Sequence, residues 1–395
     1  MKVLIIPAWY SSTKDVASFI IDQTQVVIKK GVDVVVLIVV IKTKKQFFTE
    51  VFKKPVNIVI ENNITYLQLN YFSLFPFHFF KLFHLQLNRI NAMVLKMIKK
   101  YQQESGDFDL IHLQSVCNNL TPSIGFYLSQ KLNLPYLITE HYTSFAEGGK
   151  RIFEPYSDKE KTTEIVQQSL LNLSVSTFAS QLHSSYFNSQ FKVLPNVVPD
   201  LFLNERPTSW VANNKFTFLS IGGITERKGF DILIDAFINS FRNNQNVHLI
   251  IVGKGGLKTG LIERVEMADL SKRIRFIDSL ERIELLRLMD ESNVVVSASL
   301  METFGLTLVE AFFRGLPVIA SDSGGPKDFI TNDNGLLCKV GDRADLEGKM
   351  NWMYENYKTY DKNIIKKTAI EKYSESAIGT LICECYEEVI KRNKK

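Results

Sequence analysis

The sequence predicts an α/β protein built from two doubly wound parallel sheets. Short apolar runs alternate with helical patterns of about 10–15 residues, which is typical of buried strands joined by crossover helices. This alternation occurs twice, before and after a polar, turn-rich segment at residues 204–214. The chain of 395 residues is also too long for one ordinary domain. We therefore expect two domains.

The first series begins with the apolar run "KVLIIPAW". An amphipathic stretch from Val16 to Lys30 ends at Gly31, and a second apolar run, "VDVVVLIVVI", follows. Further strands are expected at Phe108–Leu113, Pro135–Thr139 and Leu173–Ser176. Together these elements predict a first domain at residues 1–203.

The second series begins at "FTFLSIGG" and continues through "VHLIIVG", "RIRFID", "NVVVSAS", "LPVIAS" and "GLLCKV". It predicts a second domain at residues 204–373. After a break near Tyr373, one amphipathic helix is expected from Ser374 to Lys391.

Composition excludes several classes of protein. The hydrophobic fraction of 45% and the charged fraction of 23% are those of a globular chain. The net charge of +5 is small and no basic-aromatic motif accompanies it, so no nucleic-acid partner is expected. The sequence contains no run of about 18 apolar residues, so no membrane-spanning helix is expected. Four cysteines without metal-ligand spacing predict free thiols, and a cytoplasmic protein is favoured.

The segment "SASLMETFGLTLVEAFFRGLPVIASDSGGP", residues 297–326, carries the strongest functional signal. It predicts a strand, a short loop and a helix that begins near Phe304. Free amides at the start of a helix suit a phosphate. Glu302 lies in the loop and Glu310 about two turns into the helix, where a carboxylate can bind a ribose diol. Alternatively, Glu302 caps the helix and Glu310 is exposed to solvent.

Two further loops follow predicted strands of the second series. In "SIGGITERKGFDILIDAF", Arg227 and Lys228 suit a diphosphate whose charge builds as it departs. In "IVGKGGLKTGL", Gly253 and Gly255 stand where glycine lets a nucleotide approach the backbone closely. The alternatives are a solvated basic loop and a plain tight turn. All three segments follow strands, and ligands of open parallel sheets bind at the carboxyl ends of strands.

In this order and spacing, the three segments resemble the retaining glycosyltransferases of family 4, the glycosyl transferase group 1 class with the GT-B fold. The resemblance covers nearly the whole chain. It includes "PAWYSSTKDVASF" near the start, "LITEH" at Leu137–His141, "VLPNVV" at Val193–Val198 and "YSESAIGTLICECYEEVI" near the end. It implies an α/β GT-B fold, with two Rossmann-like domains facing each other across a cleft and residues 374–395 completing the first domain.

The resemblance also implies a role for each candidate residue. Lys228 would bind the donor diphosphate, and Glu310 would hold the ribose hydroxyls. Glu302 would hold hydroxyls of the transferred sugar, which His141 would contact from the first domain, near the reacting carbon. The amides facing the sugar and phosphate would be those of Phe304, Gly305, Leu306 and Thr307.

Two positions depart from the family pattern. Many members carry an arginine where this chain has Gly223, and Arg227 is the candidate to supply that charge instead. A glycine common in the first loop is replaced by Ala17. Nothing resembles a metal-binding Asp-x-Asp, so neither a metal nor another cofactor is expected.

The implied activity is transfer of a sugar, with retention at the anomeric carbon, from a nucleotide diphosphate sugar to a glycan or lipid-linked acceptor. A hexosyltransferase of cell-surface polysaccharide biosynthesis is expected. Two alternatives stay open. A nucleotide-sugar epimerase on the same architecture would convert the donor without an acceptor, and a non-catalytic partner subunit would retain only the fold.

The stretch Tyr71–Lys100 has two interpretations. It is rich in phenylalanine and then in basic residues. Such a segment can lie on an anionic membrane surface, here the inner face of the cell membrane. It can equally form a core-facing helix with a solvated tail.

Overall fold

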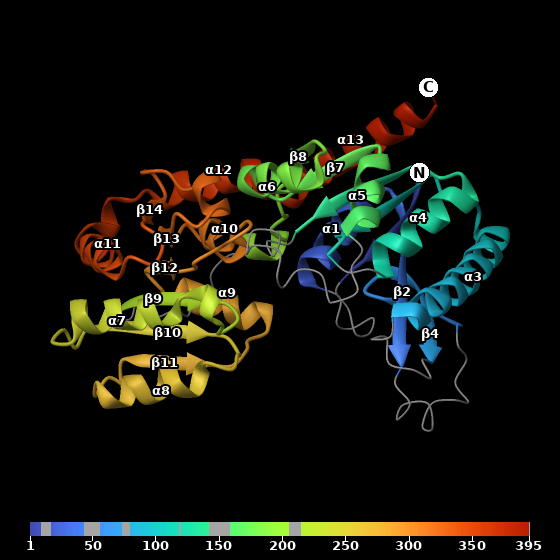
Figure 1. Ribbon diagram of the computed structural model, residues 1–395. Coiled ribbons are helices and arrows are strands. Elements are labelled where there is room, and N and C mark those ends of the chain that lie inside the picture. The colour runs from blue at the N-terminus through green and yellow to red at the C-terminus, as the bar shows by residue number, and fades with distance from the viewer. Residues whose placement is uncertain are drawn as a thin grey trace. The chain divides into compact units, whose positions relative to one another are not determined.

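The computed structural model describes residues 1–8, 17–42, 56–72, 80–117, 120–141, 159–204 and 215–394, the side chains of 80–84 excepted. The chain divides into two compact α/β units (Figure 1). The first unit comprises Met1–Val197 and Ile378–Lys395, and the second comprises Val198–Ala377. Residues 198–203 and 374–377, which the sequence analysis assigned to the first domain, belong to the second unit.

The first unit is built on a sheet of eight strands in the order β3-β4-β2-β1-β5-β6-β7-β8. The strands are β1 (Lys2–Pro7), β2 (Asp33–Lys42), β3 (Val56–Glu61), β4 (Ile64–Phe72), β5 (Leu110–Gln114), β6 (Tyr136–Glu140), β7 (Leu171–Ser174) and β8 (Phe191–Val193). Central strands are apolar on both faces because both faces are covered: Leu4 and Ile6 enter one core cluster, and Val3 and Ile5 enter the other.

One pair of strands departs from the parallel sheet that the sequence analysis expected. Strand β3 pairs antiparallel with β4. Asn62 and Asn63 join them with φ values of 50° and 62°, a conformation that two-residue hairpin turns require and asparagine tolerates. The hairpin adds an edge strand and leaves the parallel order of the central strands unchanged.

The helices of the first unit are α1 (Ser18–Lys29), α3 (Phe80–Ser105), α4 (Leu120–Leu132), α5 (Lys159–Gln168), α6 (Thr177–Phe187) and most of α13 (Glu375–Asn393). Helix α13 returns to the first unit by burying Ile378, Ile382, Tyr386 and Val389, which share one helical face. The Tyr386 hydroxyl lies 2.9 Å from Nδ1 of His112 on β5, so the carboxyl-terminal helix is anchored to the central sheet.

The second unit contains a wholly parallel sheet of six strands in the order β11-β10-β9-β12-β13-β14. Its strands are β9 (Phe216–Ile221), β10 (Val247–Val252), β11 (Ile274–Ile277), β12 (Val294–Ser297), β13 (Val318–Ser321) and β14 (Gly335–Cys338). Its helices are α7 (Phe230–Phe241), α8 (Lys258–Met267), α9 (Arg282–Asp290), α10 (Leu306–Phe313), α11 (Arg343–Asn356) and α12 (Lys362–Tyr373). The order reverses after β9, as in a doubly wound sheet.

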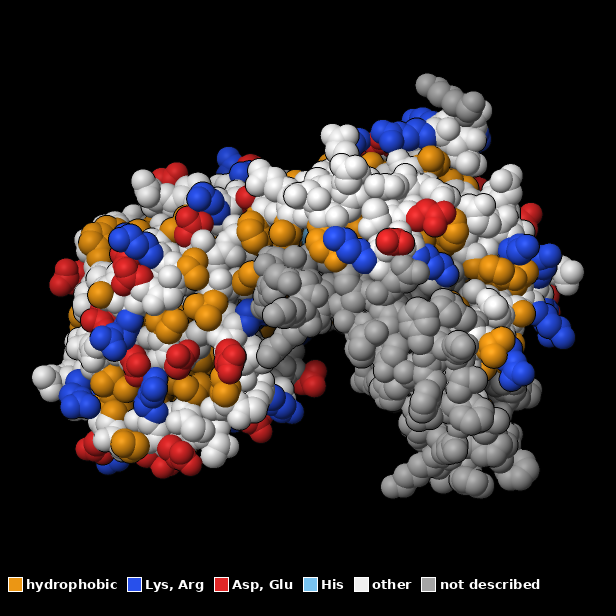
Figure 2. All heavy atoms as spheres, in the orientation of Figure 1, with side chains coloured by type: hydrophobic (Ala, Val, Ile, Leu, Met, Phe, Trp, Pro, Cys, Tyr) orange, Lys and Arg blue, Asp and Glu red, His pale blue; other side chains and the backbone are white. Residues whose placement is uncertain are grey.

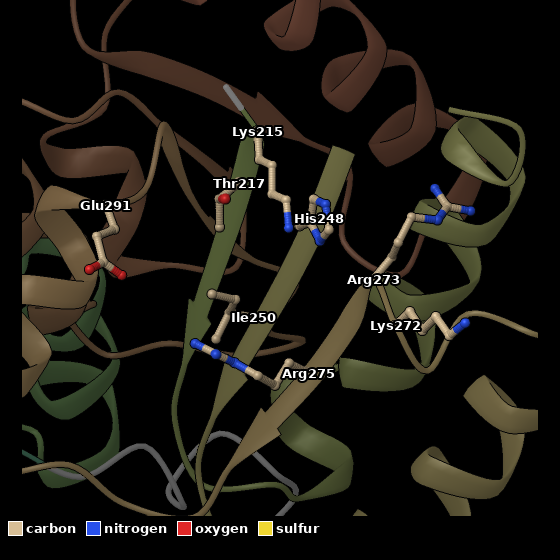
Figure 3. Close-up of a pocket in the computed structure, with 8 residues that line it drawn as sticks. All are labelled: Lys215, Thr217, His248, Ile250, Lys272, Arg273, Arg275 and Glu291. Atoms are coloured by element: carbon tan, nitrogen blue, oxygen red, sulfur yellow. The ribbon is translucent and has the colours of Figure 1, made fainter. Parts of the chain in front are cut away.

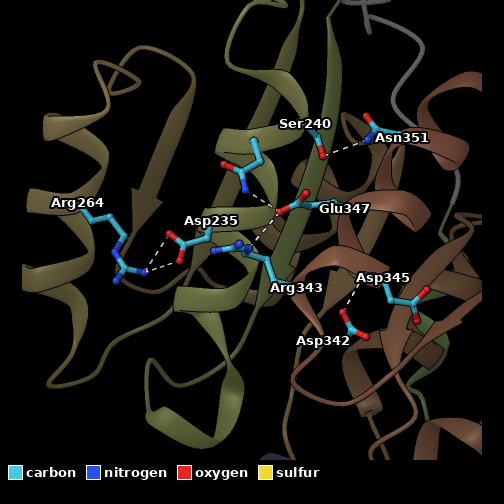
Figure 4. Close-up of polar contacts among 9 residues, drawn as sticks. Asp235, Ser240, Arg264, Asp342, Arg343, Asp345, Glu347 and Asn351 are labelled. Atoms are coloured by element: carbon cyan, nitrogen blue, oxygen red, sulfur yellow. Dashed lines mark hydrogen bonds and ion pairs between the residues drawn. The ribbon is translucent and has the colours of Figure 1, made fainter.

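Polar contacts link helix α7 to its neighbours α8 and α11 (Figure 4). Arg264 donates to Asp235 at 3.0 Å, and Asn351 donates to Ser240 at 3.2 Å. These groups are largely exposed, where such pairs contribute little. The packing beneath is stronger, because Phe218, Phe237 and Phe241 are almost wholly buried in one cluster. Burial therefore contributes more to the stability of this packing than the polar contacts do.

No helix among the described residues is long and apolar enough to cross a membrane. In Figure 2 the Lys and Arg side chains alternate with Asp and Glu over the visible face of the second unit. The mild positive charge of the chain is thus not gathered into one patch on that face.

Candidate active site

The three loops that the sequence singled out follow neighbouring strands of the second unit. Strand β9 lies between β10 and β12 in the sheet, and all three run parallel. Their carboxyl ends therefore meet at one edge. The structure brings the "GGITERKG", "GKGG" and "METFG" segments together there, at the kind of position where open parallel sheets bind ligands.

Lys228 and Glu302 form an ion pair at this edge. Their side chains are 20% and 12% exposed, so the pair is half-buried but open to solvent on one side. The Arg227 guanidinium donates to the carbonyl of Met301 at 3.3 Å, and the amide of Leu300 donates to the Arg227 carbonyl at 2.8 Å. The short 3-10 turn Glu226–Lys228 is thereby fastened to the loop after β12.

The backbone of Glu302 is fixed from its other side. Its amide donates to Ser323 and its carbonyl accepts from Gly325, at 3.0 and 2.8 Å. Gly305 then starts helix α10 with φ at 96°, a conformation that favours glycine. The first amides of a helix have no acceptor within the helix, so a cation, a carboxylate and the start of α10 lie together. That combination suits an anionic ligand that also carries hydroxyl groups.

Glu310 is buried, at 6% exposure, one turn after Leu306 on α10. The alternative that it is a solvent-exposed residue is therefore wrong. Burying a carboxylate costs free energy unless polar partners stabilise it, so Glu310 requires such partners. Phe304 is also buried, with its ring 5.6 Å from Phe329 and 5.9 Å from Tyr373. Only the backbone of Phe304 is available to a ligand.

The glycines of the "GKGG" loop allow two loops to pack against each other. A Cβ on Gly253 would lie 1.9 Å from the Gly222 carbonyl oxygen, and one on Gly255 would lie 2.0 Å from that of Ile224. The Ile224 amide donates to the Lys254 carbonyl at 2.8 Å. Because both missing side chains would strike the neighbouring backbone, these glycines position the loop that leads to Lys228.

His141 lies in the first unit, directly after β6. Its Nε2 is 2.7 Å from Oε1 of Gln114 at the end of β5, and its ring centroid is 4.6 Å from that of Phe19. Its amide donates to the buried Glu140 carboxylate, which also accepts from the Ser115 hydroxyl. Gln114 of β5 and Phe19 of α1 thus hold the imidazole, and Glu140 of β6 holds the backbone of His141.

Burial keeps His141 neutral. Loss of hydration lowers its pKa to about 3, with smaller contributions in the same direction from His112 and His183, against a hydrogen bond to Asn196 that raises it. At neutral pH such an imidazole contacts a ligand through hydrogen bonds and does not carry a positive charge. His141 is therefore suited to orienting a sugar hydroxyl.

Sequence reasoning missed most of the polar chain that supports His141. Gln114 donates to Gln23 at 3.1 Å, and Gln23 donates to Asn196 at 3.4 Å, so one line of buried amides links β5, α1 and the segment after β8. Asn196 lies in "VLPNVV" and Gln23 shortly after "PAWYSSTKDVASF", two segments that carry the family resemblance. A polar side chain at the carboxyl end of a buried strand was the signal available for Gln114.

The described residues contain no group of three His, Cys, Asp or Glu side chains placed to hold a metal ion. The four cysteines are free thiols. The polar groups at the edge of the second sheet are cationic, carboxylate and backbone amide, a set that suits phosphate and hydroxyl groups.

Known families and proteins resemble this chain. A model of the family described as glycosyl transferases group 1 matches residues 204–370. The phosphatidyl-myo-inositol mannosyltransferase of Mycobacterium leprae is 25% identical over 73% of this chain and 76% of its own length. The human alpha-1,3/1,6-mannosyltransferase ALG2 is 26% identical over 59% of this chain and 62% of its own.

Solved structures match the whole chain. Sucrose-phosphate synthase from Thermosynechococcus elongatus has a TM-score of 0.75 at 18% identity, over 99% of this chain and 100% of that one. Anabaena HepE in complex with UDP-glucose has a TM-score of 0.71 at 17% identity, over 98% and 99%. At these identities the likeness establishes the fold, which is GT-B. Residues 204–370 match the glycosyl transferases group 1 model and the named relatives are glycosyltransferases, so we identify this chain as a glycosyltransferase with a GT-B fold.

Proposed function

We propose that this enzyme transfers a hexose from a nucleotide diphosphate sugar to a glycan or lipid-linked acceptor, with retention of the anomeric configuration, in cell-surface polysaccharide biosynthesis. Two relatives are named as mannosyltransferases, one of them acting on phosphatidyl-myo-inositol. A structure of the same fold holds UDP-glucose. The observation that carries the proposal is the Lys228–Glu302 pair beside the start of α10.

The pair suggests how the donor is received. Without a ligand, the Lys228 ammonium and the Glu302 carboxylate satisfy each other. A sugar diphosphate would replace both partners at once, since its phosphate oxygens accept from Lys228 and its sugar hydroxyls donate to Glu302. Glu310 would bind the ribose hydroxyls, and the amides of Leu306 and Thr307 would face the phosphate.

The reaction then proceeds by departure of the diphosphate. The bond between the anomeric carbon and the phosphate oxygen breaks, and its electron pair stays on the diphosphate. Lys228, with Arg227 beside it, stabilises that charge. The acceptor oxygen bonds to the same face of the sugar and passes its proton to the departing phosphate oxygen. Retention follows because attack and departure share one face.

His141 is assigned to the transferred sugar. Its neutral imidazole would hydrogen-bond a hydroxyl near the reacting carbon and hold the ring in the reactive orientation. Because the donor charge is met by Lys228 and Arg227, the proposal includes no metal. Activity in excess EDTA tests that point, and loss of activity that Mg²⁺ restores would contradict it.

A second part of the proposal concerns helix α3. Ile90, Val94 and Ile98 bury one face of the helix in the core, as the core-helix interpretation expected. Lys96, Lys99 and Lys100 line an open cavity beside Tyr127 of α4, and Figure 2 shows Lys and Arg side chains over this part of the first unit. We assign this basic face to peripheral contact with an anionic membrane that carries the acceptor. Residues 73–79 of the same stretch lie outside the described residues.

A donor screen tests the proposed function. Thermal unfolding is measured with UDP-, GDP-, ADP- and dTDP-sugars. A ligand at one hundred times its dissociation constant stabilises the folded state by about 2.7 kcal/mol, so one donor should raise the melting temperature in the wild type. No shift with any nucleotide sugar would contradict the proposal.

A further inference from the structure

A second cavity lies in the second unit, at the opposite end of the strands from the donor loops. It has a volume of about 210 Å³ and is bordered by the starts of β9, β10 and β11 and by the end of α9. Lys215 precedes β9 and His248 is the second residue of β10, whereas the donor loops follow the last residues of those strands. Six-residue strands span about 20 Å, so the two places are separate.

The charged side chains of this cavity are of two kinds. In Figure 3, Lys215 and Arg275 extend over the sheet on either side of Ile250, while Lys272 and Arg273 point away from it. Arg273 instead donates to the carbonyls of Phe241 and Asn244 at 2.6 and 2.7 Å, which caps the end of helix α7. Lys215 and Arg275 are therefore the two cations available to a ligand.

These cations make no ion pair within the described part of the chain. Glu291, just past the end of α9, faces the same cavity from the other side in Figure 3 and likewise has no ion-pair partner among the described residues. Two cations and one carboxylate are thus arranged around a common space without neutralising one another. Groups left in this way are available to an external ligand that has both anionic and hydrogen-donating parts.

His248 supplies the second observation. Its Nε2 is buried and makes no hydrogen bond within the described residues, although buried polar atoms are normally paired. Burial, and then the nearby Lys215 and Arg273, lower the pKa of His248. The imidazole is therefore neutral at pH 7 and adds no charge to the cavity that it borders.

We propose that this cavity binds a small phosphate monoester that carries hydroxyl groups, such as a sugar phosphate. Lys215 and Arg275 bind the phosphate, Ile250 forms an apolar floor, and Glu291 accepts hydrogen bonds from hydroxyl groups. The cavity is large enough for a sugar phosphate, because at 10–15 Å³ per water-sized position it holds about fifteen water-sized groups. Inorganic phosphate alone fits less well, because it carries no sugar hydroxyl groups to donate to Glu291 while its negative charge faces that carboxylate.

Calorimetric titration of the full chain with glucose 6-phosphate tests the site, with saturating UDP present to occupy the donor loops. One saturable site is expected. The double variant K215M/R275M should weaken binding at least tenfold, since each charged contact to phosphate is strong. The matched control K367M/K372M removes two exposed positive charges of α12 that do not line the cavity, and should bind as the wild type does.

Further arms separate this site from the donor site. K228A should bind glucose 6-phosphate normally, and inorganic phosphate should bind at least tenfold more weakly than the sugar phosphate. The proposal is overturned if glucose 6-phosphate does not bind with UDP present, if K215M/R275M binds it like the wild type, or if inorganic phosphate binds equally well. None of these results depends on whether the enzyme uses a nucleotide sugar.

Discussion

We propose that single charged side chains beside the start of α10 hold and activate the donor. Lys228 faces Glu302, and the diphosphate would take the place of the carboxylate. Lys228→Ala should lower the transfer rate by about 10–150-fold, which corresponds to one charge-assisted contact of about 1.5–3 kcal/mol. Steady-state rates check this, and Lys367→Ala on the exposed face of α12 is the matched control. Wild-type rates in Lys228→Ala would remove this lysine from the site.

The other site residues should differ in what their loss affects. Glu310→Ala should weaken binding of the free nucleotide, since its assigned partner is the ribose. Glu302→Ala should leave the affinity for the free nucleotide nearly unchanged and lower the affinity for the sugar nucleotide. His141→Ala should slow transfer while nucleotide still binds normally. Titration calorimetry with nucleotide and sugar nucleotide separates the three. An unchanged sugar-nucleotide affinity and rate in Glu302→Ala would contradict its assignment.

The neutral histidines also make stability depend on pH. Burial lowers the pKa of both His112 and His141 from 6.5 to about 3. Between these values the unfolded chain binds a proton that the folded chain does not, so the free energy of unfolding falls as pH drops below 6.5. Each histidine contributes up to about 1.4 kcal/mol per pH unit. Denaturant unfolding at pH 7 and 5 measures the loss, and His141→Gln should reduce it. If His141→Gln lost as much free energy of unfolding between pH 7 and 5 as the wild type, protonation of His141 would not be the cause.

At the scale of elements, the packing of the two glycine-containing loops positions Lys228. Gly255→Ala would place a Cβ 2.0 Å from the Ile224 carbonyl oxygen, so we expect a loss of roughly 1–3 kcal/mol in stability together with weaker donor binding. Gly256→Ala is the control, because nothing lies within 4 Å of its Cβ position. Thermal unfolding and donor titration of both variants check the difference. Equal behaviour of the two variants would show that the loops do not depend on this packing.

Helix α3 carries the membrane prediction. The wild type should sediment with anionic liposomes at low salt and be released at high salt, because each exposed lysine near the surface contributes about 1 kcal/mol. The triple variant K96Q/K99Q/K100Q should lose most of this binding, while K358Q/K366Q/K367Q in the second unit should keep it. Absence of sedimentation at any salt concentration would leave α3 with its core-packing role alone.

Over the whole molecule, apolar runs in the sequence predicted β1, β2, β5, β6 and β7 of the first unit and all six strands of the second, but not β3, β4 or β8. The sequence also predicted the three candidate loops from their place after strands. It did not predict the β3–β4 hairpin, because two consecutive asparagines form a hairpin turn only when the strands on either side of them pair with each other. Nor did it predict the Gln23–Gln114–His141 chain, whose members lie far apart in sequence and meet only through the sheet order. Side-chain burial, which excluded an exposed Glu310, likewise required the folded structure.

The anomeric configuration of the first product tests the central proposal most directly. The purified enzyme is given the nucleotide sugar that the donor screen identifies, and the released or transferred sugar is followed by proton NMR before mutarotation proceeds. Same-face attack predicts that the first-formed product keeps the anomeric configuration of the donor, and that its formation slows by 10–150-fold in Lys228→Ala. A product of inverted configuration would contradict the mechanism built on Lys228, Glu302 and His141.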